Sequence, residues 1–266
     1  MGARQRGDRI RRMVAGTMAG RTFAIGDIHG EAEHFSRLLA RLPVLDAGDT
    51  LLFLGDYLDR GHQSKEIIEQ LMSLPTRTPA KVVCLRGNHE YAWLRVCGEG
   101  WDEFVVVPGN GCLATVRSFT GGPAPTATER PTNEDMQAMT TGSFFPDAVV
   151  HWMESLPYWY EDAHAIYVHA GLPRQGERFL HPSEVPNRLV LIWIRTEDFF
   201  RNYRGKRVVF GHTPTEFLPQ EISTHTPLDP SDAFMGEDVI GTDTGCGTGG
   251  FLTAVELPAV RVYESR

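Results

Sequence analysis

Residues 21–30 read RTFAIGDIHG, a short run of mainly apolar residues that ends in Gly-Asp-Ile-His-Gly. The run Arg21–Ile25 contains β-branched and aromatic residues and predicts a strand. Asp27 and His29 follow it directly, each beside a glycine. The stretch therefore predicts a strand whose carboxyl end carries two polar side chains, and this arrangement recurs along the chain.

Four later runs have the same form. Thr50–Leu54 precedes GDYLDRG, Val82–Leu85 precedes RGNHE, Ile166–Val168 precedes HAG, and Val208–Phe210 precedes GHT. Each run predicts a short strand. The polar residues that follow these strands are Asp56, Asp59, Arg60, Asn88, His89, His169 and His212.

Helices are predicted between the first strands. Phe35, Leu38, Leu39 and Leu42 share one helical face over residues 32–42, and a second helix, 64–74, ends before Pro75. This alternation favours an α/β protein with a parallel or mixed sheet and helices packed outside it. In such sheets, ligands bind beyond the carboxyl ends of the strands, so we expect the polar residues to meet there.

The residue types in these positions suit two divalent cations. Asp27 and His29 are two residues apart, so in an extended segment both side chains point the same way and form half of a first metal site. Asn88, His169 and His212 offer oxygen and nitrogen donors to a second ion. Asp56 could bridge the two. Nitrogen and oxygen ligands without thiolate favour Mn²⁺, Fe or Zn²⁺ over Ca²⁺, and our leading expectation is Mn²⁺.

The motifs GDIHG, GDYLDRG, RGNHE, HAG and GHT together resemble those of the calcineurin-like metallophosphatases, in particular the bacterial and phage form of the phosphoprotein phosphatases. The matching region runs from about Arg21 to Val255. The resemblance implies an α/β fold in which two mixed β-sheets form a sandwich flanked by α-helices. It also implies that Asp27, His29 and Asp56 bind one metal ion, and that Asp56, Asn88, His169 and His212 bind the other.

The resemblance gives the remaining motif residues roles as well. Arg60 would bind phosphate oxygens through its planar guanidinium, and Arg195, in Leu-Ile-Trp-Ile-Arg, looks like the second phosphate-binding arginine. His89 would be the general acid, and Asp59 would orient its ring and raise its pKa. A hydroxide held between the two metal ions would attack phosphorus directly, so that no phospho-enzyme forms.

The implied function is hydrolysis of phosphoserine and phosphothreonine in proteins, with phosphotyrosine as a further substrate. The alternative is hydrolysis of diadenosine tetraphosphate or a related dinucleotide, because those enzymes share the fold and metals. Asp59 and Glu90 match the protein phosphatase pattern, whereas the segment Trp193–Arg195 recurs in the dinucleotide enzymes. An inactive scaffold would lack metal ligands, and none is missing from the motifs.

We expect residues 1–20 to form a disordered tail and residues 21–266 to form one domain, with a variable insertion around 97–146 that covers one side of the active site. Within it, 121–142 is rich in Gly, Pro and Thr and predicts a loop or an excursion on the surface. A second set of apolar residues on one helical face, from Phe145 to Leu156, predicts a further helix.

Composition limits the partners. The 266 residues carry 26 Lys and Arg against 34 Asp and Glu, a net charge of −8, so we expect no nucleic-acid partner. No apolar run is long enough to span a membrane. Cys84, Cys97, Cys112 and Cys246 form no CxxC pair and are expected to be reduced thiols. We expect a cytoplasmic monomer whose substrate is a phosphoprotein or a phosphorylated small molecule.

Overall fold

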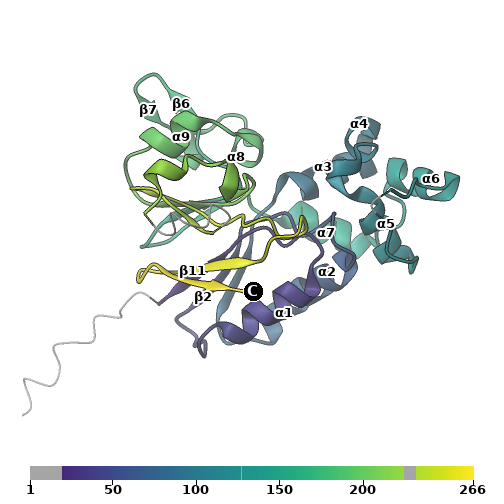
Figure 1. Ribbon diagram of the computed structural model, residues 1–266, viewed down its shortest axis with the longest axis horizontal. Helices are drawn as coiled ribbons and strands as arrows, with labels where there is room; N and C mark the ends of the chain where they lie inside the picture. The colour runs from purple at the N-terminus through teal and green to yellow at the C-terminus, as the bar shows by residue number, and fades with distance from the viewer. Residues whose placement is uncertain (1–19, 127, 225–231) are drawn as a thin grey trace, which may run out of the picture.

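A computed structural model describes residues 20–126, 128–224 and 232–266 (Figure 1). Its described residues form two five-stranded mixed sheets. The first sheet has the order β12 (Arg261–Glu264), β11 (Thr253–Leu257), β1 (Thr22–Ile25), β2 (Thr50–Phe53), β3 (Lys81–Cys84). The second has the order β4 (Trp159–Glu161), β5 (Ile166–Val168), β8 (Val208–Phe210), β10 (Val239–Gly241), β9 (Phe234–Met235). A small hairpin joins β6 (Arg174–Gln175) and β7 (Arg178–Phe179).

The strand pattern explains why the two sheets pack together. Successive residues of a strand point to opposite faces, so β1 buries Phe23 and Ile25 on one face and Ala24 on the other. Ala24 shares a buried cluster with Tyr167 and Val209 of the second sheet. The two sheets therefore face each other across an apolar layer, and the predicted sandwich of two mixed sheets is confirmed.

Helices cover the outer faces of the sandwich, as predicted. The first sheet packs against α1 (Ala32–Arg41), α2 (Ser64–Ser73), α3 (Asn88–Glu99) and α7 (Asp147–Ser155), and the second against α8 (Val190–Trp193) and α9 (Glu197–Asn202). Figure 1 shows α1 and α2 along the sheet that contains β2 and β11. It shows α8 and α9 in the upper part of the view, away from that sheet. Short 3₁₀ turns complete the connections: η1 (Leu74–Thr76), η2 (Pro108–Asn110), η3 (Pro182–Glu184), η4 (Thr215–Phe217) and η5 (Gln220–Ile222).

The segment 97–146 forms a helical group beside the first sheet. After the end of α3 come α4 (Asp102–Val105), α5 (Cys112–Thr120) and α6 (Asn133–Thr141), which stand together at one side in Figure 1. Cys112, Val116 and Met139 belong to the same buried cluster as the first sheet and its helices. The insertion is thus packed against the sheet whose strands precede Asp27, His29, Asp56 and Asn88.

The prediction that 121–142 is a loop throughout was wrong, because α6 occupies much of it. Thr132 and Asp135 form a capping box: the Thr132 hydroxyl accepts from the Asp135 N–H, and the Asp135 carboxylate accepts from the Thr132 N–H. Gly142 ends the helix with φ of +62°. Caps of this kind define a helix even where composition favours a loop.

Two further expectations can be compared with the structure. Cys84, Cys97, Cys112 and Cys246 are all free thiols. Among the described residues, no helix has both the length and the apolar character that crossing a bilayer would need. The expected tail, residues 1–20, lies outside the described residues except for Gly20.

Candidate metal centre and active site

The polar residues that follow the strands meet between the two sheets. β1, β2 and β3 are parallel to one another, as are β5, β8 and β10, so their carboxyl ends lie at shared edges. All six predicted metal ligands are buried: Asp27, His29, Asp56, Asn88, His169 and His212. Buried charged and imidazole groups in this number need partners or cations.

Two groups of donor atoms converge on Asp56. His29, Asp56 and His89 have ligand atoms within 4.8 Å of one another, and so do Asp56, His169 and His212. Nε2 of His29 is 3.6 Å from one Asp56 oxygen, and Nε2 of His169 is 3.4 Å from the other. Asp56 is therefore placed as the sequence predicted for a bridging carboxylate, between two sets of nitrogen donors.

The tautomers fit metal binding. Nδ1 of His29 is 2.8 Å from the carbonyl oxygen of Leu58, and Nδ1 of His169 is 2.9 Å from that of Leu54. A carbonyl only accepts, so each Nδ1 carries a proton, and in the neutral ring Nε2 is the nitrogen with the lone pair. Nε2 of His29 and Nε2 of His212 are buried and have no hydrogen-bond partner. Such orphaned lone pairs in a polar cluster are what a bound cation would satisfy.

Electrostatics favour neutral forms of His29 and His212, whereas His169 differs: burial opposes its protonation, but the charge of Asp56 raises its pKa to about 9. Burial, together with the charge of Arg60, holds the pKa of His29 well below its usual value. Burial and His169 do the same for the pKa of His212. Burial alone would raise the pKa of Asp56, but His169 and His89 hold it well below the ordinary range. Neutral imidazoles beside an ionised carboxylate are the forms that bind divalent metals.

Asn88 and Asp27 occupy different places in this arrangement. The Asn88 side-chain oxygen is 3.0 Å from Nε2 of His169, so the two donors point to a common position. Asp27 belongs to neither converging group; its carboxylate accepts from the backbone N–H of His212 at 3.0 Å. The expectation of an extended segment that aligns Asp27 and His29 was wrong, because His29 has φ of +46°.

Left-handed backbone conformations are concentrated in the site. Among the described residues, six that are not glycine have positive φ, and five of these are predicted site residues: His29, Asp56, Asp59, Arg60 and His212. Each such residue costs about 1 kcal/mol or more relative to an unstrained conformation. The turns after the strands thus bring side chains inward at a conformational cost.

Glu90 supports Asp56 in a way that its position in the sequence did not reveal. One carboxylate oxygen accepts from the N–H groups of Gly87 and Asp56, both at 2.9 Å, and the other from Tyr57 at 2.8 Å. In the sequence, Glu90 was noted as a match to the protein phosphatase pattern; in the structure it lies in the first turn of α3. Burial, and then repulsion from Asp56, raise the pKa of Glu90 to about 7.

His89 and Asp59 form a hydrogen-bonded pair. Nδ1 of His89 is 2.7 Å from the Asp59 carboxylate, which also accepts from Trp93 Nε1 at 2.9 Å and from the Thr115 hydroxyl at 2.6 Å. Burial opposes protonation of His89, but the charge of Asp56 and the hydrogen bond to Asp59 leave its pKa raised. The ring orientation leaves Nε2 as the nitrogen free to act on a substrate.

The two predicted phosphate-binding arginines lie beside the two histidine groups. The charge of Arg60 lowers the pKa of His29, and that of Arg195 lowers the pKa of His212. Nη2 of Arg195 donates to the carbonyl oxygen of His212 at 3.0 Å. Arg60 has a buried Nε without a partner. Both guanidinium groups are therefore near the position where donors converge.

Asp243 was not among the predicted site residues. Asp243 is buried, one of its carboxylate oxygens has no partner, and its charge raises the pKa of Asp27. One feature of the sequence could have indicated a role for Asp243. It follows β10 closely, and β10 pairs in parallel with β8, the strand that precedes His212.

Comparisons with known proteins agree with this fold. A family model described as calcineurin-like phosphoesterase matches residues 20–216. Among solved structures, a protein described as a "putative diadenosine tetraphosphatase" has 22% sequence identity and a TM-score of 0.56, over 93% of this chain and 94% of that one. A cold-active protein-tyrosine phosphatase of a psychrophilic Shewanella species has 16% identity and a TM-score of 0.55, over 92% and 77%. A metallophosphoesterase from Sphaerobacter thermophilus has 19% identity and a TM-score of 0.50, over 92% and 87%. At these identities the structures show a shared fold.

Proposed function

The chain belongs to the calcineurin-like phosphoesterase family, and from this premise we propose that it is a metal-dependent phosphomonoesterase that removes phosphate from serine and threonine side chains of proteins. One observation carries the proposal. Two groups of buried donors share Asp56, and one of them includes His89, whose ring is paired with Asp59. This set combines cation binding with a group placed to protonate a leaving oxygen.

The first role of the site residues is to hold metal ions. His29, Asp56, His169 and His212, with Asp27 and Asn88 close by, would hold two divalent cations, of which we favour Mn²⁺. When bound, such ions supply positive charge for the phosphoryl oxygens and lower the pKa of water to near neutrality. Asp56 serves both positions because its two oxygens point to different histidines.

Arg60 and Arg195 would orient the phosphoryl group. A guanidinium can donate two parallel hydrogen bonds to phosphate oxygens; the charge of Arg60 acts on His29, and Arg195 contacts His212. His89 would pass a proton from Nε2 to the departing oxygen, because its Nδ1 is engaged with Asp59. Asp59, itself fixed by Trp93 and Thr115, keeps the ring in that orientation.

The alternative function is hydrolysis of dinucleoside polyphosphates. It is favoured by Arg195, because the segment Trp193–Arg195 recurs in such enzymes. Arg195 also donates to the carbonyl oxygen of His212. Against it, Asp59 and Glu90, the residues of the protein phosphatase pattern, are both buried and fully engaged by hydrogen bonds. The two functions share one site and differ in substrate.

The deciding experiment assays purified protein with Mn²⁺ on phosphoserine and phosphothreonine peptides and, in parallel, on diadenosine tetraphosphate. Asp56→Asn is the blank for contaminating activity. A higher kcat/KM for the peptides supports the proposal, and a higher kcat/KM for the dinucleotide supports the alternative. Metal binding without activity on either substrate would contradict both.

A further inference from the structure

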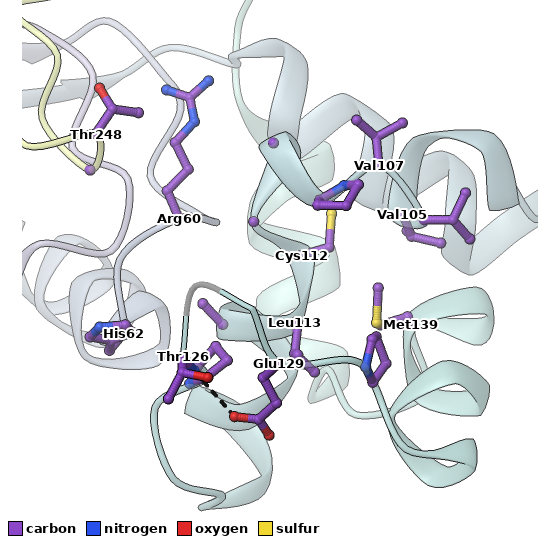
Figure 2. Close-up of a pocket in the computed structure, with 18 of the residues that line it drawn as sticks. Arg60, His62, Val105, Val107, Cys112, Leu113, Thr126, Glu129, Met139 and Thr248 are labelled. Atoms are coloured by element: carbon purple, nitrogen blue, oxygen red, sulfur yellow. Dashed lines mark hydrogen bonds between the residues drawn. The ribbon is translucent and has the colours of Figure 1, made fainter.

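A cavity of about 600 Å³ opens beside the candidate active site, between Arg60 and the insertion (Figure 2). Figure 2 shows Arg60 and Thr248 on one side and Val105 and Val107 on the other. Leu113 and other apolar side chains of the insertion also line it. The volume lies within the range of pockets that bind small ligands or side chains.

The inner wall of the cavity adjoins the catalytic groups. The backbone N–H of Arg60 donates to the carbonyl of Gly111 at 3.3 Å, so the phosphate-binding arginine is attached to the cavity wall. Cys112, also in that wall, has its sulfur 3.8 Å from an Asp59 carboxylate oxygen. A group in the cavity could therefore be part of the same molecule as a phosphoryl group at Arg60.

The charges in the cavity oppose an anionic occupant. Of the described residues that line it, Arg60 is the one Lys or Arg, whereas Glu31 and Glu129 are carboxylates. Glu129 is already bonded to Arg117 at 3.0 Å and to the Thr126 N–H at 3.1 Å, so it is held in place. The charge of Glu129 is offset by Arg117, so among the described lining residues Glu31 is the carboxylate without an ion pair, and a polyphosphate chain would pass it.

The rim of the cavity is apolar and uncovered. Among the described residues, four large apolar side chains are exposed, and two of them, Val106 and Val107, line this cavity with 49% and 46% exposure. Apolar surface that continues from a cavity into solvent marks a place where another apolar group binds.

We propose that this cavity binds an apolar side chain of the substrate peptide, near in sequence to the phosphorylated residue. The inference rests on the proposed function and extends it to substrate selection. A peptide side chain brings apolar surface without charge, which matches the walls and avoids the two carboxylates. A nucleobase on a polyphosphate chain would bring its charges past them.

The test uses phosphoserine peptides in which a single leucine occupies each flanking position in turn, with serine elsewhere. Burial of a leucine side chain predicts that at one position the leucine peptide has a kcat/KM about 10-fold or more above that of the all-serine peptide. Val107→Asp places a charge in the cavity and should bring this ratio close to one. Val44→Asp is the matched control, because Val44 is 93% exposed and does not line the cavity.

Binding is measured as well, with peptides that carry a non-hydrolysable phosphonate in place of phosphoserine. The ratio of their Kd values should follow the same pattern as kcat/KM. The inference is overturned if no position shows a leucine preference, or if the preference survives in Val107→Asp. It is also overturned if Val107→Asp impairs diadenosine tetraphosphate hydrolysis while the peptide ratio stays unchanged. Absence of all hydrolysis would contradict the proposed function, and the Kd ratio would still decide the role of the cavity.

Discussion

The hydroxyl of Thr115 donates a 2.6 Å hydrogen bond to the carboxylate of Asp59, 56 residues away in the sequence. The same hydroxyl oxygen accepts from the backbone N–H of Asp59 at 2.8 Å and lies 3.0 Å from the Ser64 hydroxyl. All three residues are buried. Helix α5 of the insertion therefore fixes both the backbone and the side chain of the residue that orients His89.

Replacing Thr115 should loosen this connection. Thr115→Val leaves a buried charged acceptor and a buried N–H short of one partner each, and should lower the free energy of unfolding by about 1.5–3 kcal/mol. Thr115→Ser retains the hydroxyl and should lie close to the wild type. Urea denaturation measures the difference, and phosphatase activity should fall in the valine variant. Equal stability of the two variants would show that the bond is unimportant.

Metal binding should stabilise the wild type through the residues that converge on Asp56. At a free Mn²⁺ concentration of about 100 times Kd, the gain in the free energy of unfolding is about 2.7 kcal/mol per site, which raises Tm. Asp56→Asn removes a charge shared by both sites and should abolish most of this shift. Asp147→Asn, at the start of α7, is the control. Tm is measured with and without Mn²⁺, and a full shift in Asp56→Asn would argue against the assigned ligands.

Substitution of His89 should harm poor leaving groups most. A general acid contributes about 10²–10⁴-fold, and a serine alkoxide needs its proton far more than a nitrophenolate does. His89→Asn should therefore lower kcat/KM much more on a phosphoserine peptide than on p-nitrophenyl phosphate. His151→Asn, on exposed α7 surface, should leave both values near those of the wild type. Equal losses on the two substrates would contradict the role of His89 as acid.

The packing of α5 against α6 within the insertion should weaken in acid. Asp135 accepts from Nε and Nη2 of Arg117 at 2.8 and 2.7 Å, and these hydrogen bonds hold the pKa of Asp135 well below its usual value. A depressed folded-state pKa contributes stability above the unfolded value of about 4 and loses it as pH falls through the folded value. The free energy of unfolding should thus decrease below about pH 4.

Asp135→Asn isolates this contribution. The variant should be about 2 kcal/mol less stable than the wild type at pH 7 and should show a flatter dependence of stability on pH below about 4. Asp198→Asn disrupts an exposed pair with Arg174 and should change little at either pH. Urea denaturation at pH 7 and pH 3 tests both. An unchanged pH slope in Asp135→Asn would place the acid sensitivity elsewhere.

Much of the fold and of the site could be predicted because short sequence segments indicate both the strands and the polar residues that follow them. Each apolar run predicted a strand, and the residues directly after it, such as Asp56 or His212, were placed by the polarity of parallel strands. Boundaries moved by one or two residues; Thr50–Leu54 was expected where β2 covers Thr50–Phe53. The position of a motif residue is therefore fixed by the strand that directly precedes it.

What could not be predicted depends on contacts between distant segments or on backbone angles. No local pattern connects Thr115 to Asp59, or Asp243 to Asp27, because β-sheet pairing and helix packing bring them together. The left-handed angle at His29 is imposed by the surrounding turn, so the expectation of an extended segment failed. Composition concealed α6, whose capping box, Thr132 with Asp135, was the overlooked indication.

The left-handed residues of the site have a consequence for attempts to make this protein more robust. Glycine adopts positive φ without steric cost, so replacing Arg60, whose buried Nε has no partner, by glycine relieves backbone strain of about 1 kcal/mol. Selection for heat resistance alone would thus favour the loss of a residue that we expect to bind phosphate. Any such library needs a catalytic screen at every round, or its most durable members will be inert.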